Sequence, residues 1–253
     1  MKVIFIGDIV GKPGRKAIRL ALPDIYAKYK PDIVIANIEN AAGGLGVTYE
    51  KYEELNDTAI DFFTSGNHIW HHKEVEKWLD DVDNLIRPAN YKDAPGRGWA
   101  IFKNTAIINL EGRVFMSCLE NPFTTADAIL KQIPDEIKVR IVDMHAEATS
   151  EKAALAWYLD GRVSAVIGTH THVQTGDARI FPQGTAFLTD AGMTGPMNSV
   201  IGMDVASVTR RFITQRPTRF SVPSGAKILS YVYLEIDDRT GHALKIENKI
   251  IKI

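Results

Sequence analysis

The sequence predicts an α/β protein, a four-layer α-β-β-α sandwich in which two packed mixed β-sheets are flanked by helices. Residues 1–65 alternate short apolar runs with amphipathic segments, which is typical of parallel strands joined by helices. From Trp99 onward, shorter apolar runs follow one another closely, which indicates hairpins and a second sheet. Apolar residues make up 45% of the chain, enough for a sizeable core.

The N-terminal part is expected to fold as β-α-β-α-β, with parallel strands because such crossovers are right-handed. The expected strands are Val3–Ile6, Ile33–Ala36 and Ile60–Ser65. Their continuous apolar character predicts strands covered on both faces. The expected helices are Pro13–Tyr29, one capped by Thr48, and Lys73–Leu79.

The rest of the chain is expected to add strands and helices, with strands dominating the last third. The expected strands are Trp99–Phe102, Ala106–Ile108, Val114–Met116, Val139–Met144, Val163–Ile167, Ala186–Leu188, Ile228–Ile236 and Ala243–Ile253. The expected helices are Thr124–Ile133, Glu151–Leu159 and Asp204–Ile213. The chain shows no internal repeat, low-complexity tract or linker, so residues 1–253 are expected to form a single domain.

Charge and composition exclude several kinds of partner. Lys and Arg number 30 and Asp and Glu 31, so no basic excess favours tight nucleic-acid binding. No apolar stretch approaches the ~20 residues that span a bilayer, and the N-terminus lacks a signal peptide's apolar segment. We therefore expect a cytoplasmic protein without a membrane partner. Cys118 is the only cysteine, which excludes an internal disulfide, and its apolar neighbours predict a core position.

Five of the expected apolar strands end in side chains that can bind metals. These side chains are Asp8, Glu39, Asn40, Asn67, His68, His145, His170 and His172. Open α/β sheets place their ligands at strand carboxyl ends, so this clustering predicts a metal site. Alternate residues of an extended segment point to the same side, so His170 and His172 can face one cavity.

The ligand types indicate more than one metal ion. Two carboxylates, two amides and three imidazoles exceed the roughly four ligands that a tetrahedral zinc takes. They suit two ions of higher coordination, and a carboxylate could bridge them. Mixed oxygen and nitrogen donors without a thiolate favour Mn or Fe.

These motifs resemble those of a known superfamily. Gly7-Asp8, Gly66-Asn67-His68, His145 and Gly168-Thr169-His170-Thr171-His172 resemble the calcineurin-like metallophosphoesterases in order and spacing. Asn37–Gly44 and Thr189–Gly195 narrow the resemblance to the YmdB-like branch, bacterial proteins similar to cyclic-nucleotide phosphodiesterases. The superfamily's Asp-x-His is here Asp8-Ile9-Val10, and Glu39 replaces the usual bridging Asp, as in that branch.

The resemblance implies a ligand set and a reaction. One ion would take Asp8, Glu39, Asn40 and His172, and the other would take Glu39, Asn67, His145 and His170. The implied enzyme is a phosphodiesterase acting on small diesters, above all 2′,3′-cyclic nucleotides. A metal-bridging hydroxide would attack phosphorus, and His68 would protonate the leaving group. The resemblance also favours a homo-oligomer.

Two other functions stay open, a metal-dependent phosphomonoesterase (protein phosphatases included) and a non-catalytic regulator whose metal site organises a binding surface. Met193 and Thr194 could line the substrate pocket or form a plain turn. His71 and His72 are expected to be solvated or to support the ligands indirectly. Gly7–Pro13 imitates a phosphate-binding loop, but Pro13 stands where Ser or Thr should bind Mg²⁺, so nucleoside-triphosphate hydrolysis is not expected.

Overall fold

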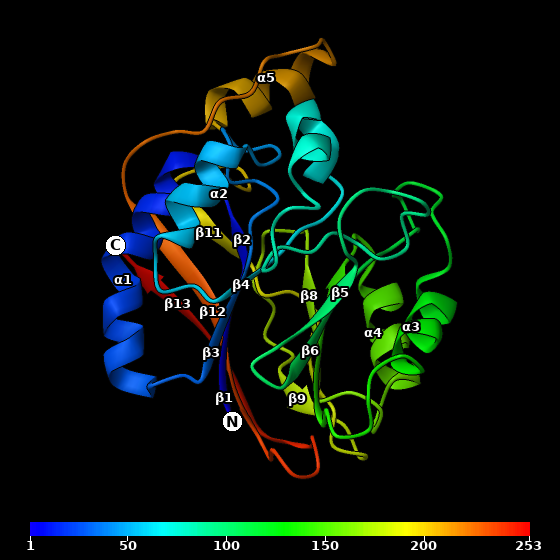
Figure 1. Ribbon diagram of the computed structural model, residues 1–253. Coiled ribbons are helices and arrows are strands. Elements are labelled where there is room, and N and C mark those ends of the chain that lie inside the picture. Colours follow the sequence, from blue (N-terminus) through cyan, green and yellow to red (C-terminus); the bar gives the residue numbers. More distant parts are fainter.

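Two β-sheets packed face to face form the centre of the computed structural model, which describes residues 1–253 (Figure 1). The strands of the seven-stranded sheet are β1 (Lys2–Ile6), β2 (Asp8–Ile9), β3 (Ile33–Asn37), β4 (Phe62–Thr64), β11 (Met193–Pro196), β12 (Lys227–Ile236) and β13 (Ala243–Lys252). Those of the six-stranded sheet are β5 (Trp99–Phe102), β6 (Thr105–Glu111), β7 (Val139–His145), β8 (Ala165–Thr169), β9 (Arg179–Ile180) and β10 (Ala186–Leu188). Their orders are β2-β11-β12-β1-β3-β4, with β13 paired to β12, and β5-β6-β7-β8-β10-β9. Both sheets combine parallel and antiparallel pairs, as predicted.

Helices cover the two outer faces of this pair of sheets. The chain forms the helices α1 (Gly11–Tyr29), α2 (Tyr49–Asn56), α3 (Pro122–Leu130), α4 (Thr149–Tyr158) and α5 (Val205–Thr214), and the short 3₁₀ helices η1 (Ile69–His71) and η2 (Lys73–Lys77). Figure 1 shows α1 and α2 on one side of the sheets and α3 and α4 on the other. The layers therefore run α-β-β-α, which confirms the predicted fold class. None of the helices combines the length and apolar character needed to cross a membrane.

Three apolar clusters hold the layers together. The central cluster of 18 buried residues joins the two sheets and includes Phe5 and Ile35 from one and Ile141 and Ile167 from the other. A cluster of 26 joins the seven-stranded sheet to α1 and α2, and a cluster of 17 joins the six-stranded sheet to α3 and α4. Successive strand residues face opposite sides, so a strand covered on both faces must be apolar throughout, as Val3–Ile6 is.

Parallel pairing gathers strand ends at one edge of each sheet. β1, β3 and β4 run parallel to one another, as predicted, and so do β6, β7, β8 and β10. The carboxyl ends of neighbouring parallel strands lie at the same edge, so the loops that follow them lie side by side. Most of the candidate ligands are in these loops.

The chain between β6 and α3 differs from the prediction. The predicted strand Val114–Met116 does not form, and Phe115 has a φ of +62° and is 89% exposed. Cys118 is also exposed, so its predicted core position is wrong. Both sides of β6, the strand that this segment follows, are already paired, with β5 and with β7, so the segment cannot add a hairpin strand to it.

The predicted helix at Lys73–Leu79 is the shorter 3₁₀ helix η2. Its backbone bonds reach back three residues, from the Val75 amide to the His72 carbonyl at 3.0 Å and from the Trp78 amide to the Val75 carbonyl at 3.2 Å. Val75, Trp78 and Leu79 are buried in the cluster beneath α1 and α2. The apolar spacing therefore correctly predicts which side of the segment is buried, but it does not predict that the helix is of the 3₁₀ type.

The central cluster generates a stability prediction. Phe5 is fully buried between the sheets, so Phe5→Ala should lower the free energy of unfolding by about 3–5 kcal/mol through lost burial and a cavity. The exposed Phe115 is the matched control, and Phe115→Ala should change it by less than about 0.5 kcal/mol. Urea unfolding followed by circular dichroism measures both values. Equal losses in the two variants would contradict this placement of the core.

Candidate metal centre

The predicted ligands come together at the carboxyl ends of strands from both sheets. Asp8 follows β1, and Glu39 and Asn40 follow β3. His145 ends β7 in the facing sheet, and these four residues are fully buried. Gly66 is needed beside them, since a Cβ there would lie 2.4 Å from Glu39 Oε2 and 2.3 Å from His145 Nε2. The glycine in Gly66-Asn67-His68 therefore lets the backbone approach the ligands closely.

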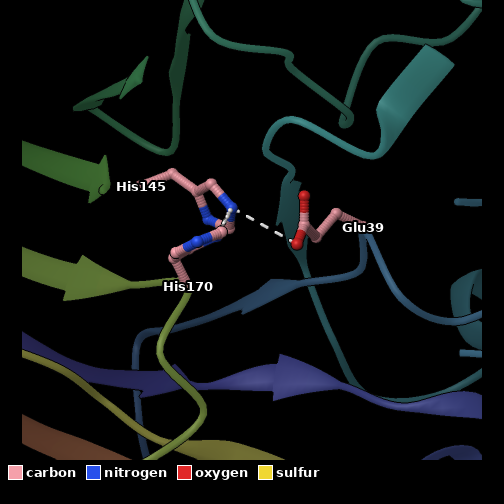
Figure 2. A group of neighbouring side chains, drawn as sticks. All are labelled: Glu39, His145 and His170. Carbon is pink, nitrogen blue, oxygen red and sulfur yellow. Dashed lines mark hydrogen bonds and ion pairs between the residues drawn. The ribbon is translucent and has the colours of Figure 1, made fainter. Parts of the chain in front are cut away.

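One ligand group consists of Glu39, His145, His170 and Asn67. Figure 2 shows the first three side chains pointing toward one another from different elements. His145 Nε2 lies 3.2 Å from Glu39 Oε1, 3.1 Å from His170 Nδ1 and 2.9 Å from Asn67 Oδ1. Ligands about 2.1 Å from an ion and at right angles to each other stand about 3.0 Å apart. Each of the other three atoms therefore stands at a ligand-like distance from His145 Nε2.

The second ligand group consists of Asp8, Glu39 and His172, with Asn40 beside them. One ligand atom from each of the first three lies within 4.8 Å of the others. The amide nitrogen of Asn40 donates to Glu39 Oε1 at 2.9 Å and lies 3.1 Å from His172 Nε2. A half-turn of this amide would present its oxygen to an ion instead. Glu39 alone belongs to both groups, so it is the residue able to bridge two ions.

Hydrogen bonds decide which nitrogen of His145 faces the site. Its Nδ1 lies 2.8 Å from Thr169 Oγ1, whose hydroxyl donates to Asp143 Oδ1 at 2.7 Å. Because Thr169 donates to the carboxylate, it accepts from Nδ1–H, which leaves Nε2 to bind a metal. Burial raises the pKa of Asp143 to about 6, and it also accepts from Thr64 and Asn37.

The other two imidazoles are oriented in the same manner. His172 Nδ1 donates to the Ile201 carbonyl at 2.8 Å, so its Nε2 faces Asn40 and the second ligand group. His170 Nε2 pairs with Glu147 Oε2 at 3.2 Å, so its Nδ1 faces His145. Each imidazole thus turns a nitrogen that can lack a proton toward the site.

The protonation chemistry of the cluster fits bound cations. Burial disfavours charge on His145, yet the Glu39 carboxylate raises its pKa to about 9. Burial, together with His145, lowers the pKa of His170 to about 3. Oδ1 of the fully buried Asp8 has no hydrogen-bond partner. Protonation of the cluster therefore leaves Asp8 Oδ1 without a hydrogen bond, and a metal ion at this position would compensate it.

His68 lies at the rim of this cluster. Its backbone N–H donates to Glu39 Oε2 at 2.9 Å, and its Nδ1 lies 2.9 Å from Asn40 Oδ1. The side chain is 33% exposed and Nε2 makes no hydrogen bond within the protein. The imidazole can therefore reach a molecule that enters from solvent.

Four other predicted residues lie around the centre. Met193 and Thr194 form part of β11, with Met193 opposite Asp8 in register, and both are buried. Their contact with substrate stays a prediction, and their burial beside β2 favours a supporting position. His71 is exposed, and His72 Nε2 bonds to the Leu45 carbonyl at 3.1 Å.

Three carboxylates near the ligands were not predicted from the sequence. Asp143 and Glu147 each lie two residues from His145 in the sequence. In a strand this spacing places side chains on the same face, so both carboxylates could have been predicted. Glu111 pairs with His145 in register at the end of β6, and both its buried oxygens lack a hydrogen-bond partner. Burial raises the pKa of Glu111 to about 7. No sequence pattern marked this residue.

Comparisons with known proteins agree with this fold. The 2′,3′-cyclic-nucleotide 2′-phosphodiesterase of Bacillus subtilis (strain 168) is 48% identical over 256 residues, 99% of this chain and 97% of that protein. The solved structure of a phosphatase from Mycoplasma pneumoniae has a TM-score of 0.93 at 35% identity, covering 100% of this chain and 93% of that one. The calcineurin-like phosphoesterase YfkN of Bacillus subtilis shares the fold, with a TM-score of 0.57 at 12% identity over 99% of this chain and 90% of that one.

The family comparison gives the most specific result. The model of the YmdB-like protein family matches residues 4–249. Together with the Bacillus subtilis relative, this match makes the chain a phosphoesterase hydrolase. The chain belongs to the YmdB-like family.

Proposed function

We propose that this chain is a two-metal phosphodiesterase that hydrolyses small phosphodiesters, foremost 2′,3′-cyclic nucleotides. The observation that carries the proposal is the position of Glu39, which two separate groups of metal-ligand atoms share. The substrate comes from the Bacillus subtilis relative, whose name states this activity and whose sequence is 48% identical over nearly the whole chain. The neutral net charge of the chain agrees with a small substrate rather than a long nucleic acid.

Seven side chains would hold the two ions. Asp8, Glu39, Asn40 and His172 would bind one, and Glu39, Asn67, His145 and His170 would bind the other. Oxygen and nitrogen donors without a thiolate favour Fe or Mn at both positions. When bound, such a pair of ions lowers the pKa of water and stabilises charge on the phosphoryl oxygens.

His68 would act as the general acid. In the imidazolium form, Nδ1–H pairs with Glu39 Oε1 at 3.3 Å, and Nε2–H is free to approach the leaving oxygen. When the ester bond to phosphorus breaks, the Nε2 proton passes to the leaving alkoxide. A neutral imidazole remains, with its Nδ1–H still directed at Glu39. Imidazole is the side chain best suited to such proton transfer near neutral pH.

Hydrolysis of 2′,3′-cyclic AMP by Mn²⁺-loaded protein tests the proposed function. We expect turnover that falls at least about 100-fold in Asp8→Ala, since losing one ligand of a metal site disables its electrostatic contribution. Asp135→Ala is the matched control, because Asp135 is exposed and precedes β7, at the end of that strand opposite His145. Preference for 4-nitrophenyl phosphate over diesters would instead favour a phosphomonoesterase. Two bound metals without turnover of any ester would favour a regulator.

His68→Ala tests the assignment of the general acid. The variant should keep its metals but lose about 10²–10⁴-fold in turnover of 2′,3′-cyclic AMP, whose alkoxide leaves poorly without a proton. With bis(4-nitrophenyl) phosphate the loss should be much smaller, because 4-nitrophenolate leaves unprotonated. Steady-state kinetics on both substrates measure this contrast. His71→Ala is the control and should resemble the wild type, since His71 is exposed. Equal losses on the two substrates would contradict the role of His68.

A further inference from the structure

We propose that the buried ion pair between Lys152 and Asp190 positions Asp8 and His172, and so sets the affinity of one of the two metal sites. Neither member of the pair is a ligand in the proposed centre. The inference rests on that centre and assigns a positioning role to two residues that the reaction itself does not use.

Lys152 is a fully buried lysine on a helix that covers the outer face of a sheet. It belongs to the first turns of α4, and its Nζ lies 2.8 Å from Asp190 Oδ2, with both side chains 0% exposed. A Cβ at Gly168 in β8 would lie 2.9 Å from Lys152 Cδ and even closer to the Thr189 carbonyl. The glycine before Thr169 thus leaves room for the lysine stem to reach Asp190. A charged lysine is tolerated in the protein interior only when a partner compensates its charge.

Both carboxylate oxygens of Asp190 accept hydrogen bonds from backbone amides, one in each of two loops. Oδ2 accepts from the Thr171 amide at 3.0 Å as well as from Lys152, and Oδ1 accepts from the Gly192 amide at 2.8 Å. One loop carries the histidine ligands that follow β8. The other precedes β11, the strand that pairs with Asp8. A single side chain therefore holds together the two segments beside the second ligand group.

The hydrogen bond from the Thr171 amide to Asp190 lies between two residues with unusual backbone conformations. His170 has a φ of +101° and His172 a φ of +67°, a region that side chains with a Cβ rarely adopt. Thr171 lies between them, and its amide is the one that Asp190 holds. His172 can present Nε2 to the site only while this conformation is kept.

The hydrogen bond from the Gly192 amide to Asp190 affects Asp8 indirectly, through the Gly192 carbonyl. The Gly192 carbonyl accepts from the Asp8 amide at 3.0 Å, and a Cβ at Gly7 would clash with the same carbonyl. Fixing Gly192 therefore fixes the backbone of Asp8. Asp8, Asn40 and His172 are the three ligands that only the second group contains, so two of its three exclusive ligands depend on Asp190.

The first ligand group depends less on this ion pair. His170 adjoins Thr171, but Asn67 follows β4, and His145 is held through Thr169 and Asp143. Neither Asn67 nor His145 makes a hydrogen bond to Lys152 or Asp190. Loss of the ion pair should therefore weaken the second metal site more than the first, whereas general unfolding would weaken both alike.

Mn²⁺ binding to full-length Asp190→Asn tests the inference. The amide group places a donor where one carboxylate oxygen accepts, so the bond to Thr171 or to Gly192 is lost. Wild-type protein should bind two Mn²⁺ per chain and show the electron paramagnetic resonance spectrum of a coupled pair. The variant should bind the second Mn²⁺ at least tenfold more weakly and show the six-line spectrum of an isolated ion. A coupled pair with wild-type affinity in the variant would overturn the inference.

A double variant separates positioning from stability. Lys152→Met/Asp190→Asn removes both buried charges at similar volume, so it should regain melting temperature lost in Asp190→Asn. It should still lack tight binding of the second Mn²⁺, and it carries the test if the single variant does not fold. Recovery of both metals together with stability would show a purely structural ion pair and overturn the inference.

Asp160→Asn is the matched control. Asp160 is also a buried carboxylate, and it accepts from the Gln183 and Thr185 amides at 3.1 and 3.3 Å without contacting a ligand loop. Its loss should lower the melting temperature but leave both Mn²⁺ ions bound. A lost second ion in this control would overturn the selective role of Asp190. Absence of a coupled pair in the wild type would instead overturn the two-metal centre.

Discussion

The carboxylate of Glu39 is the point on which the site depends. It is fully buried, it lies 3.2 Å from the His145 imidazole, and it belongs to both groups of ligand atoms. A buried carboxylate among imidazoles and a second carboxylate, Asp8, needs nearby positive charge. Protonation of His145 supplies only part of that charge, and Asp8 Oδ1 remains without a hydrogen-bond partner. The electrostatics of the folded chain therefore favour cations at this position.

The fold brings this cluster together by joining two sheets at their carboxyl edges. Glu39 follows a strand of one sheet and His145 ends a strand of the other, while the 18-residue cluster between the sheets fixes their relative position. Interactions behind the ligands then set their orientation, through Asp143 and Thr169 for His145 and through the Asp190 carboxylate for the loop after β8. The apolar core thus sets the distance between the ligand groups, and buried polar groups set the direction of each ligand.

The ligands could be predicted from the sequence because each follows an apolar run, and such runs fold as parallel strands whose ends meet. The ion pair between Lys152 and Asp190 could not be predicted in this way, because it joins residues far apart in the sequence. The left-handed backbone of His170 also departs from the extended segment assumed for the histidine pair. The core position predicted for Cys118 is wrong because apolar neighbours in the sequence do not by themselves make a segment pair into a sheet. The local sequence pattern therefore predicts which residues form the site, whereas tertiary packing determines how they are oriented.

Anomalous diffraction from crystals of the Mn²⁺-loaded protein tests the bridging role of Glu39 most directly. The account predicts two manganese peaks on either side of the Glu39 carboxylate, about 3.5–4 Å apart as in other two-metal sites. One peak should contact His172 and the other His145 and His170. A single peak, or two peaks that do not share Glu39, would contradict the account.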